Sequence, residues 1–171
     1  MTDLAFSKTK TNLSGVRNKD LQKTNTNNFS NTLKTQRISW NEYALRIAEV
    51  ASMRSEDPFV KVGACALDHS NRVVGVGYNG ISPGVDVTED FWKDRDERRK
   101  FMIHAEVNCL SLVKRGQVKI LACTLFPCLS CCQMISAYSI QEVVYRDVYN
   151  NDMRGVEFLK FAGITTQQIF K

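Results

Sequence analysis

Apolar residues recur along this chain at helical and strand spacings that alternate from about residue 39 onward. Residues 39–42 fit a capping box, and the apolar positions that follow at helical spacing predict an amphipathic first helix. Two apolar runs at residues 62–67 and 72–78, separated by a short polar turn, predict a β-hairpin. The glycines and the proline of residues 80–84 indicate a loop after this hairpin.

The second half of the chain continues the alternation of helix and strand. We expect helices over residues 104–114, 128–138 and 152–162, and strands over residues 119–126, 142–146 and 164–170. Gly163 suits the end of the last helix. This order predicts an α/β fold, a three-layer α/β/α sandwich whose central mixed sheet of about five strands is flanked by helices.

The first 37 residues differ from the rest in composition. They are rich in Thr, Asn, Ser and Lys and contain seven Lys/Arg against two Asp/Glu, whereas the other 134 residues contain 16 of each. Such a segment cannot bury enough apolar surface to fold alone. We expect a polar basic extension over residues 1–37, either flexible or packed on a neighbouring subunit, and one domain over residues 38–171.

Charge and composition narrow the class of protein. With 171 residues and 43% hydrophobic content, the chain can form one substantial core. An enzyme acting on polynucleotides needs a basic groove, so the balanced charge of the domain favours a small ligand and predicts no nucleic-acid partner. The sequence has no apolar run of membrane-spanning length and no apolar leader, which predicts a cytoplasmic protein with no membrane partner and reduced cysteines.

Two short motifs carry candidate metal chemistry: His104-Ala105-Glu106 and Pro127-Cys128-Leu129-Ser130-Cys131. A catalytic zinc typically has three protein ligands and leaves its fourth position to water, whereas a structural zinc has four. His104, Cys128 and Cys131 supply three. Glu106 is close enough in sequence to exchange protons with the water, and this H-x-E…P-C-x-x-C pattern is typical of zinc deaminases of nucleobases. We therefore predict Zn²⁺ as the cofactor and Glu106 as the catalytic residue.

A structural zinc is the main alternative. It needs a fourth ligand, for which other cysteines are available, and Cys132 could also replace Cys131; the four candidates are Cys65, Cys109, Cys123 and Cys132. Free cysteines are more often small core residues. Pro127 suits the first turn of a helix that presents Cys128 and Cys131 on one face, with its N-terminus favouring thiolates.

Further motifs occur in the same order as in deoxycytidylate deaminases. They are Arg54-Ser55-Glu56-Asp57-Pro58, Lys61-Val62-Gly63-Ala64, Gly77-Tyr78-Asn79-Gly80 and Pro83-Gly84, followed by the two metal motifs. Residues 39–171 resemble this family. The resemblance implies the cytidine deaminase fold, one zinc per chain, and hydrolysis of dCMP to dUMP and ammonia, which supplies thymidylate synthesis. It also implies a homo-oligomer, commonly a hexamer, activated by dCTP and inhibited by dTTP, with Mg²⁺ accompanying the effector.

The resemblance further implies substrate contacts. Asn79 would hydrogen-bond the deoxyribose, the backbone of Ala105 would contact the cytosine edge, and Tyr149 would contact the substrate. Taken alone, Asn79 fits a residue that tolerates positive φ in a turn, and Tyr149 fits a core aromatic.

A second nucleotide site is expected near the glycine-rich loop, with Asn79, Gly80, Ile81 and Arg115 as effector contacts. The charged run at residues 92–100 fits a solvated helical face with i,i+4 pairs, or a contact to a subunit or triphosphate.

The alternative functions are deamination of another cytidine nucleotide including dCTP, of free cytidine or of tRNA adenosine. A non-catalytic, zinc-stabilised nucleic-acid-binding module is an alternative of a different class.

Overall fold

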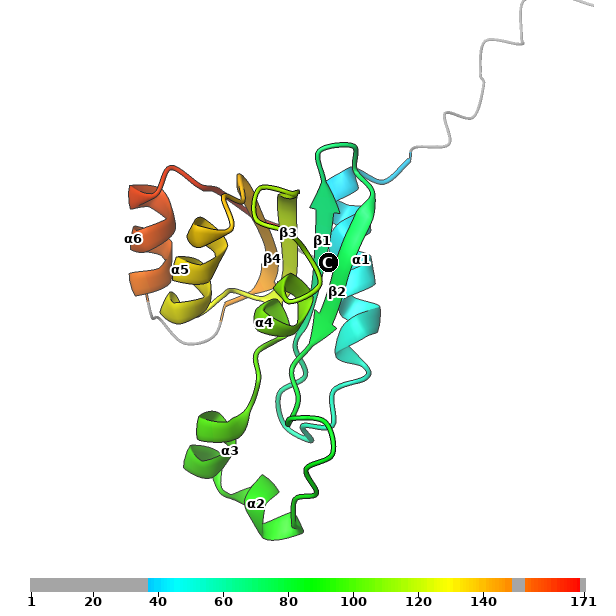
Figure 1. Cartoon of the computed structure of the whole chain (residues 1–171), viewed down its shortest axis with the longest axis vertical. Helices are drawn as coiled ribbons and strands as arrows, with labels where there is room; N and C mark the ends of the chain where they lie inside the picture. The colour runs from blue at the N-terminus through cyan, green and yellow to red at the C-terminus, as the bar shows by residue number, and fades with distance from the viewer. Residues whose placement is uncertain (1–36, 149–152, 170–171) are drawn as a thin grey trace, which may run out of the picture. The chain divides into compact units, whose positions relative to one another are not determined.

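The computed structural model describes residues 37–148 and 153–169, which form eleven helices and strands (Figure 1). The helices are α1 (Trp40–Ser52), α2 (Glu89–Lys93), α3 (Arg95–Phe101), α4 (Ala105–Leu110), α5 (Leu129–Ala137) and α6 (Arg154–Phe161). The strands are β1 (Gly63–Asp68), β2 (Val73–Tyr78), β3 (Val118–Leu125), β4 (Glu142–Asp147) and β5 (Thr165–Gln168). All of the expected extension before Arg37 lies outside the described residues.

The five strands form one mixed sheet in the order β2-β1-β3-β4-β5. β1 is antiparallel to β2 and to β3, while β3, β4 and β5 run parallel to one another. The hairpin, the mixed sheet and the number of strands are therefore as the sequence predicts. Ser39 caps α1 by accepting a hydrogen bond from the Glu42 backbone N–H at 3.1 Å, as the capping box predicts.

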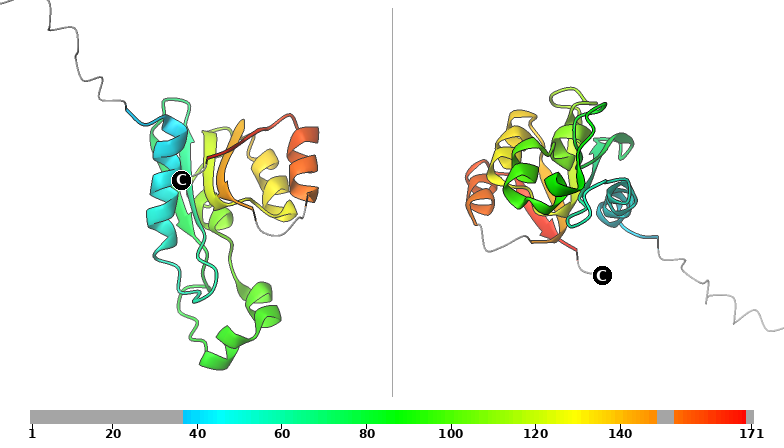
Figure 2. Two further views of the ribbon diagram at one scale, coloured as in Figure 1. Left: turned by 180° about the vertical axis from the view of Figure 1, so that it is seen from behind. Right: turned by 90° about the horizontal axis from the view of Figure 1, so that it is seen from below.

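Helices cover both faces of this sheet (Figure 2). Successive strand residues point to opposite faces, and two separate clusters of buried side chains follow from this. On one face α1 contributes Ala44, Leu45 and Ala48. On the other, α4, α5 and α6 contribute Cys109, Ile135 and Leu159, among others. The three-layer α/β/α sandwich is thus confirmed, and none of the helices in the described residues is long and apolar enough to span a membrane.

Close backbone packing sets the position of α4. A Cβ atom at Gly77 would clash with backbone atoms of Ala105 and Cys109, and one at Gly75 would lie 2.7 Å from the Cys109 carbonyl oxygen. Only glycine at these β2 positions lets α4 lie this close to the sheet. The start of α4 is consequently held beside the end of β2.

Two helix predictions need correction. The helix expected over residues 104–114 ends at Leu110 because turns follow, including Gly116 at a φ of 78°. The helix expected from residue 128 begins at Leu129, and Cys128 is its extended N-cap, with a φ of −67° and a ψ of 168°. Pro127 therefore precedes the helix instead of occupying its first turn, which lets the Cys128 sulfur turn toward His104.

The charged run also differs from the continuous solvated face. It spans the end of α2, Asp94 and most of α3. Figure 1 shows both helices beyond the end of the sheet, and neither has a buried residue. Asp94 separates them because its side chain accepts hydrogen bonds from the backbone N–H groups of Asp96 and Glu97. Lys93 pairs with Asp90, just before the run, and Lys100 pairs with Glu97, both at i,i+3 spacing. Arg98 instead pairs with a distant carboxylate.

Candidate active site

The three predicted metal ligands meet where two helices begin. His104 is the N-cap of α4, Cys128 is the N-cap of α5, and Cys131 lies in the first turn of α5. The ligand atoms of these residues all lie within 4.8 Å of one another. His104 Nδ1 is 3.3 Å from Cys131 Sγ and 3.5 Å from Cys128 Sγ.

These separations suit a tetrahedral zinc ion. Zinc bonds of about 2.3 Å to sulfur and 2.0 Å to nitrogen place neighbouring ligand atoms about 3.6 Å apart. Across residues 37–148 and 153–169, no fourth histidine, cysteine or carboxylate joins the cluster. The Cys132 thiol instead lies 3.4 Å from the Pro127 carbonyl oxygen. The donor set therefore fits a zinc site with an open fourth position better than a closed structural site.

The cluster favours a thiolate at Cys128. Hydrogen bonds from the Cys131 thiol and from His104 lower the pKa of Cys128 to about 4. Burial has the opposite effect elsewhere, raising the pKa of Cys65 and of Cys132 to about 12. Since the thiolate is the form that binds metal, the electrostatics separate the exposed Cys128 from the core cysteines.

Glu106 lies beside this cluster with only 4% of its surface exposed. Burial raises the pKa of its carboxyl group above the usual value. A carboxyl group that retains a proton closer to neutral pH is suited both to accept and to donate one during a reaction. The geometry is therefore compatible with general acid–base catalysis by Glu106.

A pocket with a volume of about 280 Å³ opens onto His104, Glu106 and Cys128. Its other walls combine apolar side chains with an amide and an ion pair, and include Val60, Val62, Leu125, Phe126, Asp57, Asn79 and Arg98. Apolar walls with a few polar groups are typical of sites for small molecules. The pocket thus joins the candidate metal ligands to a space in which a ligand can be held.

Asn79 lines the pocket but is also part of the structure that supports it. Its side chain accepts a hydrogen bond from the Val62 N–H at 2.7 Å and donates one to the Val60 carbonyl at 2.8 Å. Its φ is not positive, so the turn explanation is wrong. A side-chain amide has two N–H donors and two acceptor lone pairs. These two bonds leave the second N–H and the second oxygen lone pair of the amide unused.

The other residues predicted to contact the substrate or an effector do not all lie at the pocket. Ala105 lines the pocket, whereas Tyr149 lies outside the described residues. Gly80 pairs with Ile103, and the Ile81 N–H donates to Glu56.

Arg115 does not join the loop residues in this chain. Asn79 directly follows β2, and the end of β2 pairs with the start of β1. Arg115 lies just before β3, and the first residue of β3 pairs with the end of β1. The length of β1 therefore separates them by roughly 20 Å.

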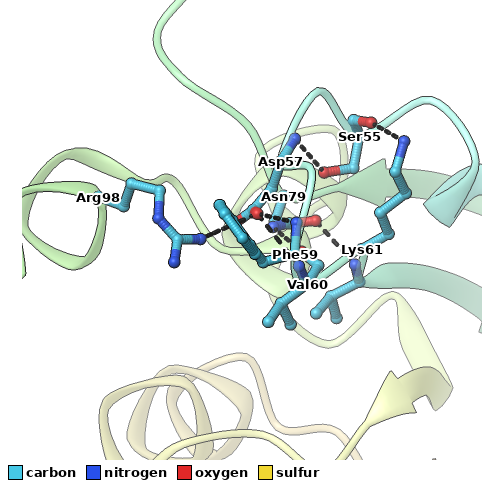
Figure 3. A network of polar contacts seen from close by, with 8 residues as sticks. Ser55, Asp57, Phe59, Val60, Lys61, Asn79 and Arg98 are labelled. Atoms are coloured by element: carbon cyan, nitrogen blue, oxygen red, sulfur yellow. Dashed lines mark hydrogen bonds and ion pairs between the residues drawn. The ribbon is translucent and has the colours of Figure 1, made fainter. Parts of the chain in front are cut away.

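Sequence reasoning missed an ion pair at the pocket. Arg98 Nη1 lies 3.0 and 3.1 Å from the two carboxylate oxygens of Asp57, 41 residues away (Figure 3). Asp57 belongs to one of the motifs shared with deoxycytidylate deaminases, but no role was predicted for it. The i, i+3, i+4 spacing of Arg95, Arg98 and Arg99 could have indicated a cationic helical face, although it does not relate that face to Asp57.

Comparison with known proteins is consistent across sequence and structure. Residues 38–147 match the cytidine and deoxycytidylate deaminase zinc-binding region. Deoxycytidylate deaminase of Pongo abelii is 31% identical over 145 residues, which cover 72% of this chain and 80% of that protein. The Homo sapiens enzyme of the same name is 30% identical over 145 residues, with the same coverage.

A solved structure gives the same likeness in three dimensions. The dCMP deaminase of cyanophage S-TIM5, in complex with dCMP and dUMP, superimposes with a TM-score of 0.62 and 26% sequence identity. The match covers 75% of this chain and 95% of the phage chain.

Proposed function

Because this chain belongs to the cytidine and deoxycytidylate deaminase family, we propose that it hydrolyses dCMP to dUMP and ammonia. The observation that carries the proposal is the meeting of His104, Cys128 and Cys131 beside a buried carboxyl group in one pocket. The relatives named deoxycytidylate deaminase and the phage enzyme in complex with dCMP favour this nucleotide as the substrate. Its product, dUMP, would supply thymidylate synthesis.

His104, Cys128 and Cys131 would hold one zinc ion per chain. Zinc in such a site activates a water molecule for attack on the ring carbon that carries the amino group. Glu106 would accept a proton from the water on its carboxylate, deliver it to the ring nitrogen, and then help the amino group leave as ammonia. Its burial next to the ligands supports this role.

Three residues would orient the substrate. The donor and lone pair that remain on the Asn79 amide support a contact with the deoxyribose. The position of Ala105 at the pocket supports a backbone contact with the cytosine edge. Tyr149 is proposed as a further substrate contact from the family resemblance alone.

Regulation by dCTP and dTTP, with Mg²⁺, would use Asn79, Gly80, Ile81 and Arg115. Because Arg115 lies at the other end of the sheet, such a site would take Arg115 from a second copy in a homo-oligomer, for which a hexamer is the favoured form.

We also propose a polar extension over residues 1–37 and a catalytic domain over residues 38–171, supported by the family match that begins at residue 38. A cytoplasmic location is supported by six free cysteines.

The regulatory proposal predicts sigmoidal turnover against dCMP, with a curve that shifts when dCTP or dTTP is added with Mg²⁺. An effector shifts the curve only if it binds two states of the oligomer unequally. Steady-state rates over a range of dCMP concentrations test this. Hyperbolic rates that saturating dCTP and dTTP leave unchanged would eliminate regulation without affecting the enzyme assignment.

The proposed substrate is tested by comparing dCMP, dCTP, cytidine and an RNA stem-loop carrying adenosine. We expect kcat/KM for dCMP to exceed each of the others by at least about tenfold, a difference of about 1.4 kcal/mol in transition-state stabilisation. Ultraviolet absorbance of the base follows each reaction. A preference for the RNA or for cytidine would assign the site to a different substrate.

A further inference from the structure

One face of α3 gives the pocket its cationic wall. Arg95, Arg98 and Arg99 lie on the same side of the helix because they are spaced i, i+3 and i+4, and all three line the pocket. Apart from His104, they are the basic side chains lining it in the described part of the chain. An anionic group on a bound ligand would therefore be most stable next to α3.

Arg98 attaches this helix to the rest of the domain. Its side chain is only 12% exposed and that of Asp57 only 6%, so the ion pair between them is shielded from water. The guanidinium also lies 4.4 Å from the centre of the Phe59 ring. Since α3 has no buried residue, this shielded ion pair helps to hold the helix at the pocket.

Asp57 is itself fixed by the backbone of its loop. Its Oδ1 accepts hydrogen bonds from the Phe59 N–H at 2.8 Å and the Val60 N–H at 3.1 Å. The carbonyl of Val60 in turn accepts from Asn79, and Figure 3 shows these contacts joining in one network. The anchor for α3 is thus a rigid part of the pocket wall.

The charges on α3 are not equivalent. Asp57 neutralises Arg98, whereas the neighbouring Arg99 is exposed and forms no ion pair within residues 37–148 and 153–169. A guanidinium suits phosphate oxygens because it presents several N–H donors in a planar fork. Arg99 is therefore available for a phosphate at the pocket, whereas Arg98 already binds Asp57 through Nη1, and its Nε is buried without a hydrogen-bond partner among the described residues.

We propose that Arg99 binds the phosphate of the substrate and that Arg98 is a positioning residue, which holds Arg99 at the pocket by docking α3 on Asp57. This inference rests on the proposed function, in which the substrate is a nucleoside monophosphate. The contact gives the enzyme a preference for the nucleotide over the corresponding nucleoside.

The direct test is Arg99→Ala, measured without any triphosphate present. The KM for dCMP should rise at least about tenfold with kcat changed less than about threefold, as expected when a charge-assisted hydrogen bond to the bound substrate is lost. Calorimetry on the zinc-loaded protein should show the same rise in Kd for dUMP and no change for deoxyuridine. Lys100→Ala is the matched control, because Lys100 is adjacent, pairs with Glu97 and does not line the pocket.

The positioning role is tested by the double variant Arg98→Met/Asp57→Asn, which removes the ion pair without leaving a buried charge. The asparagine oxygen can still accept the hydrogen bonds from Phe59 and Val60, so the loop is preserved. We expect the double variant to raise the KM for dCMP about as much as Arg99→Ala does, with unchanged zinc content. Adding Arg99→Ala to the double variant should raise the KM little further. Arg98→Lys, which keeps a cation opposite Asp57, should recover part of the loss.

Equal weakening of dUMP and deoxyuridine binding in Arg99→Ala would overturn the phosphate contact, as would no change in either. An effect that appears only with dCTP present would assign Arg99 to an effector and also overturn it. For the double variant, a fall in kcat together with loss of zinc would indicate a structural role for Arg98. Failure of the wild-type protein to deaminate dCMP would refute the proposed function separately, because the dUMP and deoxyuridine measurements require no turnover.

Discussion

Replacing Glu106 with Gln is expected to lower kcat for dCMP by about 10²–10⁴-fold, the usual contribution of a general acid–base group. Gln has nearly the same shape as Glu but cannot accept and release the proton. Glu106 is buried, and burial disfavours the charge on its carboxyl group, so an uncharged side chain of the same shape should be tolerated there. The fold should therefore persist, and steady-state kinetics on the purified variant measure the loss.

Zinc content and thermal unfolding are the controls for this variant. Both should match the wild-type protein, because Glu106 is not part of the ligand cluster. Near-normal turnover in Glu106→Gln would exclude this carboxyl group as the proton shuttle. Loss of zinc would show instead that it belongs to the metal site.

Replacing Cys131 with Ser is expected to remove the metal and, with it, the activity. A serine hydroxyl cannot replace a thiolate as a zinc ligand, and Cys131 is one of three ligands that meet in the described residues. Zinc affinity should fall more than about 100-fold, since even changes to groups behind the ligands cost 10–100-fold. Metal analysis after dialysis should find about one zinc per wild-type chain and little in the variant.

Cys132→Ser is the matched control, since it alters the next residue of the same helix. The Cys132 sulfur contacts the Pro127 carbonyl and lies outside the ligand cluster, so this variant should retain zinc. Retention of full zinc by Cys131→Ser, with loss by Cys132→Ser, would show that the two cysteines have been assigned the wrong way round.

Local sequence patterns predicted most of the fold. The hairpin, β3, β4 and α1 each carry apolar positions within one continuous segment, and the capping box marks the start of α1. The two metal motifs could be paired because their residue types suit one ion. The ends of the elements were predicted less well. The helix expected from Cys128 begins at Leu129, and the extended Cys128 places its sulfur 3.5 Å from His104 Nδ1, a contact 24 residues away in the sequence.

Long-range polar contacts could not be predicted in the same way. Arg98 stands in a run of charges whose composition is typical of a solvated helix, and Asp57 lies 41 residues earlier. No periodicity relates the two positions, and only the fold brings them together. The same applies to Asn79, whose amide proved to be held by the backbone of residues 60 and 62.

Hydrolytic deamination of dCMP is best tested by analysing the products formed in water enriched with heavy oxygen. Zinc-loaded protein should convert dCMP to equal amounts of dUMP and ammonia, with the heavy oxygen on the pyrimidine ring of dUMP, because water supplies the atom that replaces the amino group. Unchanged dCMP after incubation with fully zinc-loaded, folded protein would rule out this activity, and dUMP that lacks the heavy oxygen would rule out hydrolysis by water.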